Sequence, residues 1–316
     1  MKLFSMKTLV KSTFLILMTC TIAMSCKKTN DAGPKSVYAT ISNDPQYSFL
    51  TAAINKAGLV EALNANKPEI TLFAPTNDAF KAAGYNSLAD LAAIPNSTLA
   101  KVLLYHVLPN KVLAAAIPQA SNTAVVTLNP DPVYVTRTAA NKVFVNGVMV
   151  VKADINCTNG VIHSIGRLLM PATGNIVEAA IGNPNLNLLV AAVLRASQGS
   201  TNVAGVLAGA GPFTVFAPIN QAFINAGFAN EAAINAADPN TLASILTYHV
   251  IPGRIFSSDL TEGAMPVTAN GGSVKITLSS GAMVKGNSNA TASNIIATDI
   301  VTTNGVVHVI DQVLLP

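Results

Sequence analysis

The chain has 316 residues, of which 50% are hydrophobic, only 11% are charged and 5% are aromatic. This length accommodates two ordinary domains, and the charged fraction is well below the roughly one quarter typical of soluble domains. Three of the 19 basic residues fall within residues 1–25, which contain no acid, so the rest of the chain carries 16 basic and 15 acidic side chains. Such a nearly neutral chain excludes the basic surface that nucleic acids require and a polybasic membrane patch.

Residues 1–25 have the pattern of an export signal. Lys2, Lys7 and Lys11 precede the apolar run 14–24, "FLILMTCTIAM". Eleven residues are too few to cross a hydrocarbon core of about 30 Å as a helix, but they match the hydrophobic region of a cleaved signal peptide. We therefore expect residues 1–25 to be removed and the protein to be exported.

The dipeptide Ser25-Cys26, followed by the polar "KKTNDAGPKS", resembles the lipobox of bacterial lipoproteins, although Ala23 stands where the lipobox usually has Leu. In that family the leader is cut before a cysteine that then carries fatty acyl chains. The resemblance implies lipidation of Cys26, a tether over residues 26–36 and anchoring in the bacterial cell envelope, at the outer membrane. If Cys26 is not acylated, the protein is secreted. Once Cys20 is removed with the leader and Cys26 is acylated, only Cys157 remains as a thiol. We expect it to be a small buried hydrophobe.

Three segments of the chain occur twice, in the same order. They are "TLFAPTNDAF" (71–80) and "TVFAPINQAF" (214–223), "LLYHVLPNKV" (103–112) and "LTYHVIPGRI" (246–255), and "TNGVIH" (158–163) and "TNGVVH" (303–308). The period of 143 to 145 residues is far longer than the 20–50 residues of a solenoid repeat. The sequence therefore predicts a tandem duplication of one domain, over residues 37–171 and 175–316.

Each copy is predicted to begin with helices and to end with strands. In the first copy, a helix is indicated by apolar residues at i, i+3, i+4 and i+7, namely Leu50, Ala53, Ile54 and Ala57. "ITLFAP" then reads as a short strand that ends at Pro75, and Thr76 and Asn77 are candidate caps of the next helix. The last third alternates polar and apolar residues and includes the Asn-Gly turn of "VFVNGVMV". We expect an α+β domain in which an antiparallel sheet follows the helices.

The repeated segments resemble those of fasciclin-like domains. "TLFAPTNDAF" and "TVFAPINQAF" look like that family's first signature block, the pairs Tyr105-His106 and Tyr248-His249 its tyrosine-histidine motif, and "NGVIHSIGRLLMP" and "NGVVHVIDQVLLP" its closing block. The first copy has Gly166 where the second has Asp311. The resemblance covers residues 37–316. It implies two tandem domains, each a β-sandwich wedge with a helical layer, and an extracellular role in adhesion to proteins or polysaccharide.

The motif residues are expected to have structural roles. Four phenylalanines should anchor cores, two prolines should end strands, and two asparagines should cap helices: Phe73, Phe80, Phe216, Phe223, Pro75, Pro218, Asn77 and Asn220.

All four histidines of the chain fall within the repeat. His106 and His249 lie on the apolar stripe of a predicted helix, and His163 and His308 lie between apolar residues on one face of a predicted strand. We expect buried neutral imidazoles with hydrogen-bond partners. The alternative is one metal site per domain, because a catalytic zinc takes three protein ligands; it would use the two histidines of a domain and an acid at matching positions, Asp154 or Asp299.

The sequence lacks the patterns of common active sites, including the G-x-S-x-G elbow, the P-loop, the dinucleotide fingerprint and the calcium loop. We therefore expect no enzymatic activity and no cofactor. The leading hypothesis is an adhesion or binding protein that presents two domains from a lipid anchor. The alternatives are a structural or assembly subunit of an envelope complex, for instance one that handles polysaccharide, and a metal-dependent hydrolase. The absence of tryptophan favours an envelope or extracellular protein over polysaccharide as the partner.

Overall fold

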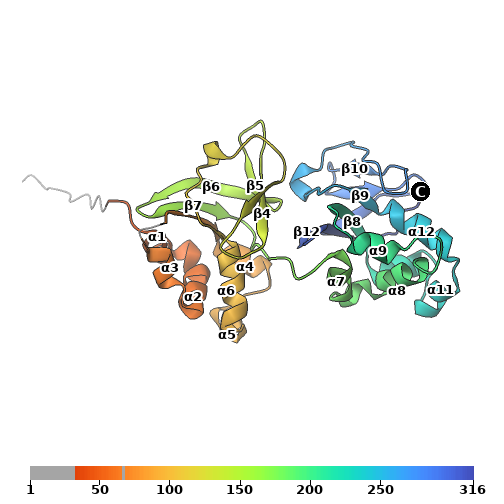
Figure 1. Ribbon diagram of the computed structural model, residues 1–316, viewed down its shortest axis with the longest axis horizontal. Coiled ribbons are helices and arrows are strands. Elements are labelled where there is room, and N and C mark those ends of the chain that lie inside the picture. The colour runs from red at the N-terminus through yellow and green to blue at the C-terminus, as the bar shows by residue number, and fades with distance from the viewer. Residues whose placement is uncertain (1–32, 66–67) are drawn as a thin grey trace, which may run out of the picture. The chain divides into compact units, whose positions relative to one another are not determined.

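The computed structural model describes residues 33–65 and 68–316 (Figure 1). The export signal and Cys26 lie outside the described residues. Two successive sets of elements follow the same order along the chain, and we refer to them as the first domain (37–171) and the second domain (175–316).

In the first domain, short helices come before most of the strands. The helical elements are α1 (Val37–Ser42), η1 (Pro45–Tyr47), α2 (Ser48–Ala57), α3 (Val60–Asn64), α4 (Asn77–Ala82), α5 (Leu88–Ala93), α6 (Asn96–Tyr105) and η2 (Ala114–Ala116). The strands are β1 (Ile70–Pro75), β2 (Val107–Leu108), β3 (Thr123–Val126), β4 (Pro132–Arg137), β5 (Val143–Val145), β6 (Val148–Cys157) and β7 (Gly160–Ile165).

Among the described residues, the second domain repeats this order with one strand fewer. Its helical elements are α7 (Ile176–Ile181), η3 (Pro184–Leu186), α8 (Asn187–Ala196), α9 (Val203–Ala208), α10 (Asn220–Asn225), α11 (Glu231–Ala236), α12 (Pro239–Tyr248) and η4 (Ser257–Asp259). Its strands are β8 (Phe213–Pro218), β9 (Val250–Pro252), β10 (Lys275–Thr277), β11 (Met283–Lys285), β12 (Ser293–Thr302) and β13 (Gly305–Ile310).

The helices begin and end where local sequence signals occur. The predicted stripe of α2 is confirmed, with Leu50, Ala53 and Ile54 buried. Helix α2 stops at Gly58, which takes the left-handed conformation with φ 71°, a backbone state that glycine adopts without steric cost. Helix α5 begins with a capping box between Ser87 and Asp90.

Each domain contains one sheet. The strand order is β2-β1-β7-β6-β5-β4-β3 in the first domain and β10-β11-β12-β13-β8-β9 in the second. The expectation of an antiparallel sheet needs one correction, because β1 pairs with β7, and β8 with β13, in parallel. The early strand of each domain is inserted beside the last one, where both of its faces are covered, as parallel strands require.

Two shifts in strand register occur in each sheet, and the second of them bends the sheet. This second shift lies in β6 near Asp154 and in β12 near Asp299, two residues with φ of 57° and 63°, and bulges of this kind increase local twist and curvature. In the first domain the helices lie against one side of the sheet (Figure 1), where they form one core with residues such as Leu72. The bent strands enclose a second core around Phe73. The predicted α+β class with a helical layer is confirmed.

No helix among residues 33–65 and 68–316 combines the length and apolarity needed to cross a membrane.

Candidate functional site

His106 and His249 hold the end of each domain against a helix. Each lies directly after the last residue of its helix, α6 or α12, and is almost completely buried. In the first domain, Nδ1 of His106 lies 2.8 Å from the Val102 carbonyl oxygen, and Nε2 accepts a hydrogen bond of 3.0 Å from the Leu169 amide. In the second domain, the same two bonds join His249 to Ile245 and Leu314, both at 2.8 Å.

This geometry requires a neutral imidazole with its proton on Nδ1. Burial lowers the pKa of His106 to about 4, and it does the same to His249, because burial disfavours the charged form. Both ring nitrogens are already engaged with backbone groups. The two rings therefore act as structural clamps.

His163 and His308 connect strands to a neighbouring loop. Nε2 of His163 lies 2.9 Å from the Val112 carbonyl oxygen, while Nδ1 accepts from the Asp154 amide at 3.2 Å. His308 has the matching partners Ile255, at 2.9 Å, and Asp299, at 3.3 Å. Burial lowers the pKa of both histidines, so these rings are also neutral and fully hydrogen-bonded.

The two histidines and the aspartate that would form a metal site in each domain are not grouped around one point. Oδ1 of Asp154 accepts from the Ala114 amide at 2.9 Å, and Oδ1 of Asp299 accepts from the Ser257 amide at 2.6 Å. Burial alone would raise the pKa of Asp299, but the hydrogen bonds from Ser257 keep it lowered. Within the described part of the chain, no three His, Cys, Asp or Glu side chains are grouped as a metal site requires.

The tyrosines of the tyrosine-histidine pairs fix the strand ends. The buried Tyr105 donates to the Pro132 carbonyl at 3.0 Å and accepts from the Asn146 side chain at 2.9 Å. Tyr248 donates to the Ser273 carbonyl and accepts from the Asn287 amide at 3.0 Å. The tyrosine and histidine of each pair thus bind different parts of the same domain.

The phenylalanines and prolines of the signature block lie where the sequence indicated. The prolines are the last residues of β1 and β8, and the phenylalanines are at most 2% exposed: Pro75, Pro218, Phe73, Phe80, Phe216 and Phe223.

The expected capping roles of Asn77 and Asn220 are wrong. Each is the first residue of its own helix, α4 or α10, and the cap of α4 is Thr76. The Asn77 side chain instead accepts from the Phe49 amide at 3.1 Å, and the Asn220 side chain accepts from the Leu188 amide at 2.9 Å. Each asparagine therefore caps a different helix, α2 or α8, through a tertiary contact that the local sequence does not reveal.

Asp311 stabilises the closing strand of the second domain. Its carboxylate accepts from the Ser293 hydroxyl at 2.9 Å and from the Asn294 amide at 2.8 Å. Gly166 at the matching position of the first domain has no side chain that could do this. Cys157 is buried, which raises its pKa.

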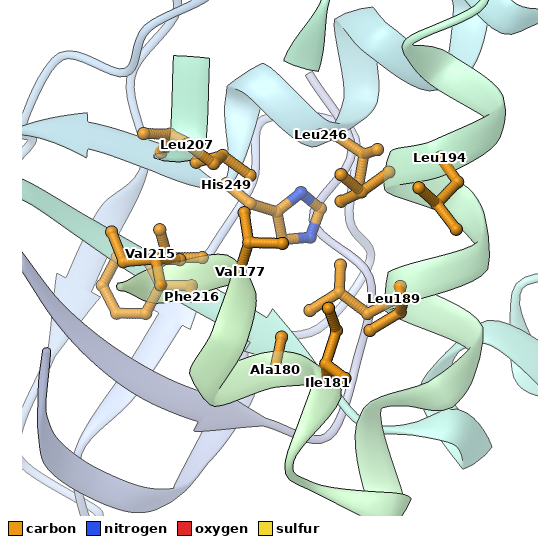
Figure 2. A pocket seen from close by; sticks show the side chains of 14 residues that line it. Val177, Ala180, Ile181, Leu189, Leu194, Leu207, Val215, Phe216, Leu246 and His249 are labelled. Carbon is orange, nitrogen blue, oxygen red and sulfur yellow. The ribbon is translucent and has the colours of Figure 1, made fainter. Parts of the chain in front are cut away.

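An apolar pocket in the second domain is the candidate binding site (Figure 2). Its cavity has a volume of about 70 Å³, and its lining comes mainly from α7, α8, β8 and α12. Of the 14 lining residues only His249 has polar side-chain atoms, and both of its nitrogens are engaged as described. The pocket thus has no group that could act as a nucleophile, acid, base or metal ligand, and it suits an apolar occupant.

Apolar side chains also surround the opening of the pocket. Ile181 at the end of α7 is 60% exposed, and Leu194 on α8 is 59% exposed. Figure 2 shows both beside the cavity, on the two helices that flank it. Exposed aliphatic side chains at the mouth of an apolar cavity are typical of a contact surface for another molecule. Sequence patterns alone did not indicate this site, because its lining comes from helices and a strand that only the tertiary fold brings together.

Several known proteins are similar to this chain. Over 248 residues it is 29% identical to transforming growth factor-beta-induced protein ig-h3 of Sus scrofa, which covers 78% of this chain and 34% of that protein. Over 143 residues it is 40% identical to protein sll1483 of Synechocystis sp., covering 45% of this chain and 73% of the relative. The chain therefore spans about a third of ig-h3 and about three quarters of sll1483.

A solved structure, a FAS1 domain pair from the insect cell adhesion molecule Fasciclin I, aligns with a TM-score of 0.41 and 17% identity, over 88% of this chain and 96% of that one. The family model of the Fasciclin domain matches this chain twice, at residues 45–171 and 189–316. These two matches cover most of both domains. The chain belongs to the fasciclin domain family.

Proposed function

We propose that this protein is an exported, non-catalytic binding protein that attaches to another protein through its fasciclin domains. The observation that carries this proposal is the apolar pocket of the second domain with its exposed aliphatic rim. Its only polar side chain, His249, is already bonded to the backbone at both nitrogens. Membership of the fasciclin family supports the same role in adhesion.

The partner of this site is a protein rather than a glycan. Sugar sites depend on hydrogen-bonding groups and on exposed aromatic platforms. This chain has no tryptophan, and the candidate site offers aliphatic walls. Protein interfaces, in contrast, are centred on buried apolar anchors.

Binding of the purified protein to an array of glycans and of envelope and matrix proteins tests this proposal. We expect saturable binding to a protein that persists when EDTA is added, because the histidines are committed to structural hydrogen bonds. An absence of binding at micromolar concentration would overturn the adhesion role and favour a structural subunit with one dedicated neighbour. Binding abolished by EDTA would instead support the metal hypothesis.

The lipid anchor at Cys26 is the second part of the proposal. The tether from residue 27 to 36 extends at most about 35 Å, so the first domain would stay close to the envelope membrane. Replacing Cys26 with alanine is expected to move the protein from the membrane fraction to the soluble fraction. The matched control is Cys20→Ala within the leader, which should leave the distribution unchanged. Retention of the Cys26→Ala protein in the membrane fraction contradicts the anchor.

A further inference from the structure

We propose that the pocket of the second domain receives one aliphatic side chain of a partner protein, and that the first domain lacks this site because its own side chains close the same position. This inference rests on the proposed binding function and assigns it to one domain and to one kind of anchor residue.

The volume of the cavity limits the size of the occupant. An engineered cavity of about 150 Å³ lined by Leu, Ile and Phe holds one benzene molecule, and the pocket here measures about 70 Å³. It therefore accommodates about half of a six-carbon ring, which corresponds to the outer end of a Leu, Ile or Met side chain. A fatty acyl chain would leave most of its carbons outside.

The chemistry of the lining determines the character of the occupant. The wall presents aliphatic groups, the Phe216 ring and the carbon edge of His249, with no free donor or acceptor. A buried amide or hydroxyl without a partner costs about 1–3 kcal/mol. A sugar, an anion or a peptide main chain inside the cavity would pay this desolvation penalty, whereas a hydrocarbon side chain would not.

The rim adds apolar contact area around the anchor. Ile181 and Leu194 are each more than half exposed, and a partner segment that inserts one side chain would cover them. No charged residue lines the pocket, so the centre of the partner segment should be uncharged. A central apolar anchor within a ring of weaker contacts is the usual arrangement of a binding hot spot.

The first domain has polar side chains at the equivalent positions. Helices α1 and α2 precede α7 and α8 by 139 residues, which matches Tyr38 to Val177 and Asn55 to Leu194. The Tyr38 ring packs against the core of the first domain, and its hydroxyl donates to Oδ1 of Asn55 at 2.6 Å. This bond links α1 to α2, where the second domain has only aliphatic side chains.

The remaining position of the rim is also polar in the first domain and aliphatic in the second. Ser42 ends α1 where Ile181 ends α7. The first domain thus replaces the three aliphatic positions of the opening with a tyrosine, a serine and an asparagine. At the matching position of the first domain a cavity of only about 10 Å³ remains, lined in part by Ile54, Leu72 and Leu103. The larger open pocket of the second domain is therefore not a requirement of the fold.

Selection from a random dodecapeptide library tests the assignment. The target is the purified protein, and the variant V177Y/I181S/L194N gives the second domain the side chains of the first. We expect the selected peptides to share one Leu, Ile or Met between uncharged residues. They should bind the variant at least about tenfold more weakly, and replacing the shared residue with alanine should have a similar effect.

The matched control changes the first domain in the opposite direction. The variant Y38V/S42I/N55L should retain full peptide binding by the second domain. The single variant Leu194→Asn, at an exposed position, provides a readout if the triple variant unfolds, and circular dichroism verifies the fold of each protein.

Several results would overturn the inference. One is equal peptide affinity for the wild type and both pocket variants. Another is micromolar binding of dodecanoate that the pocket variants abolish, which would identify a lipid site. A third is a wild-type dimer that the pocket variants dissociate in sedimentation, which would identify a second copy as the occupant. If the partner found on the protein array binds the variants normally, the inference fails while the proposed binding function stands.

Discussion

The two domains share their internal framework and differ at their surfaces. The histidine clamps have the same partners and nearly the same distances in both, from 2.8 to 3.0 Å. In contrast, Tyr38 and Asn55 bridge α1 and α2 in the first domain, whereas Val177 and Leu194 line the opening between α7 and α8 in the second. The comparison indicates that duplication preserved the interactions that close the fold, while the side chains at this opening diverged between the two copies.

Removal of a histidine clamp should lower the free energy of unfolding more than any of the other substitutions that compare the two domains. His249→Ala leaves the Leu314 amide without its acceptor and opens a cavity, so we expect the free energy of unfolding to fall by about 3–5 kcal/mol. His106→Ala should destabilise the first domain by a similar amount, because its bonds are the same. Urea denaturation of both variants measures this. Losses that differ by more than about 2 kcal/mol would show that the clamps are not equivalent.

Acid should weaken both domains through the same histidines. Their folded pKa of about 4 lies below the unfolded value near 6.5, so the unfolded chain binds more protons between these two values. Stability is therefore complete above pH 6.5 and decreases as the pH falls towards 4, by about 3 kcal/mol for each clamp histidine. Urea midpoints measured from pH 7 to pH 4 test this, and a midpoint that stays constant over the range contradicts it.

Asp311 should contribute only to the second domain. Asp311→Ala removes a carboxylate that accepts from Ser293 and Asn294, and we expect a loss of about 1–2 kcal/mol in the free energy of unfolding. Gly166→Ala is the matched change in the first domain, where no equivalent bond exists and little effect is expected. Thermal unfolding of the two variants compares them, and a larger loss from Gly166→Ala would contradict this difference.

The smallest effect is expected at the bridge that closes the first domain. Tyr38→Phe deletes only the hydroxyl that bonds Asn55, at a cost of about 0.5–1 kcal/mol for a partly exposed hydrogen bond. Urea denaturation of the variant gives the value. Val177→Phe in the second domain is a useful comparison, since it fills the opening with a ring that has no hydroxyl. A loss above about 2 kcal/mol from Tyr38→Phe would show that the bridge has a larger role than closing the opening.

The repeat and its periodicity predicted much of the framework from the sequence. The apolar stripe of α2, the buried phenylalanines and the buried histidines follow from local patterns that tertiary packing preserves. The parallel pairing of β1 with β7 and the tertiary caps made by Asn77 and Asn220 do not, because they join segments far apart in the chain. The pocket also depends on which helices lie side by side. One signal was nevertheless present, since alignment of the copies places Tyr38, Ser42 and Asn55 opposite Val177, Ile181 and Leu194.

The histidine clamp also has a consequence for the order in which each domain is completed. His106 accepts a hydrogen bond from an amide 63 residues further along the chain, and His249 accepts one from an amide 65 residues further. A chain that emerges from its N-terminus cannot make these bonds until almost the whole domain has been synthesised. Contacts of such long sequence separation slow folding. Each nascent domain therefore remains open until its last strand and the segment after it arrive, and these final residues complete the fold.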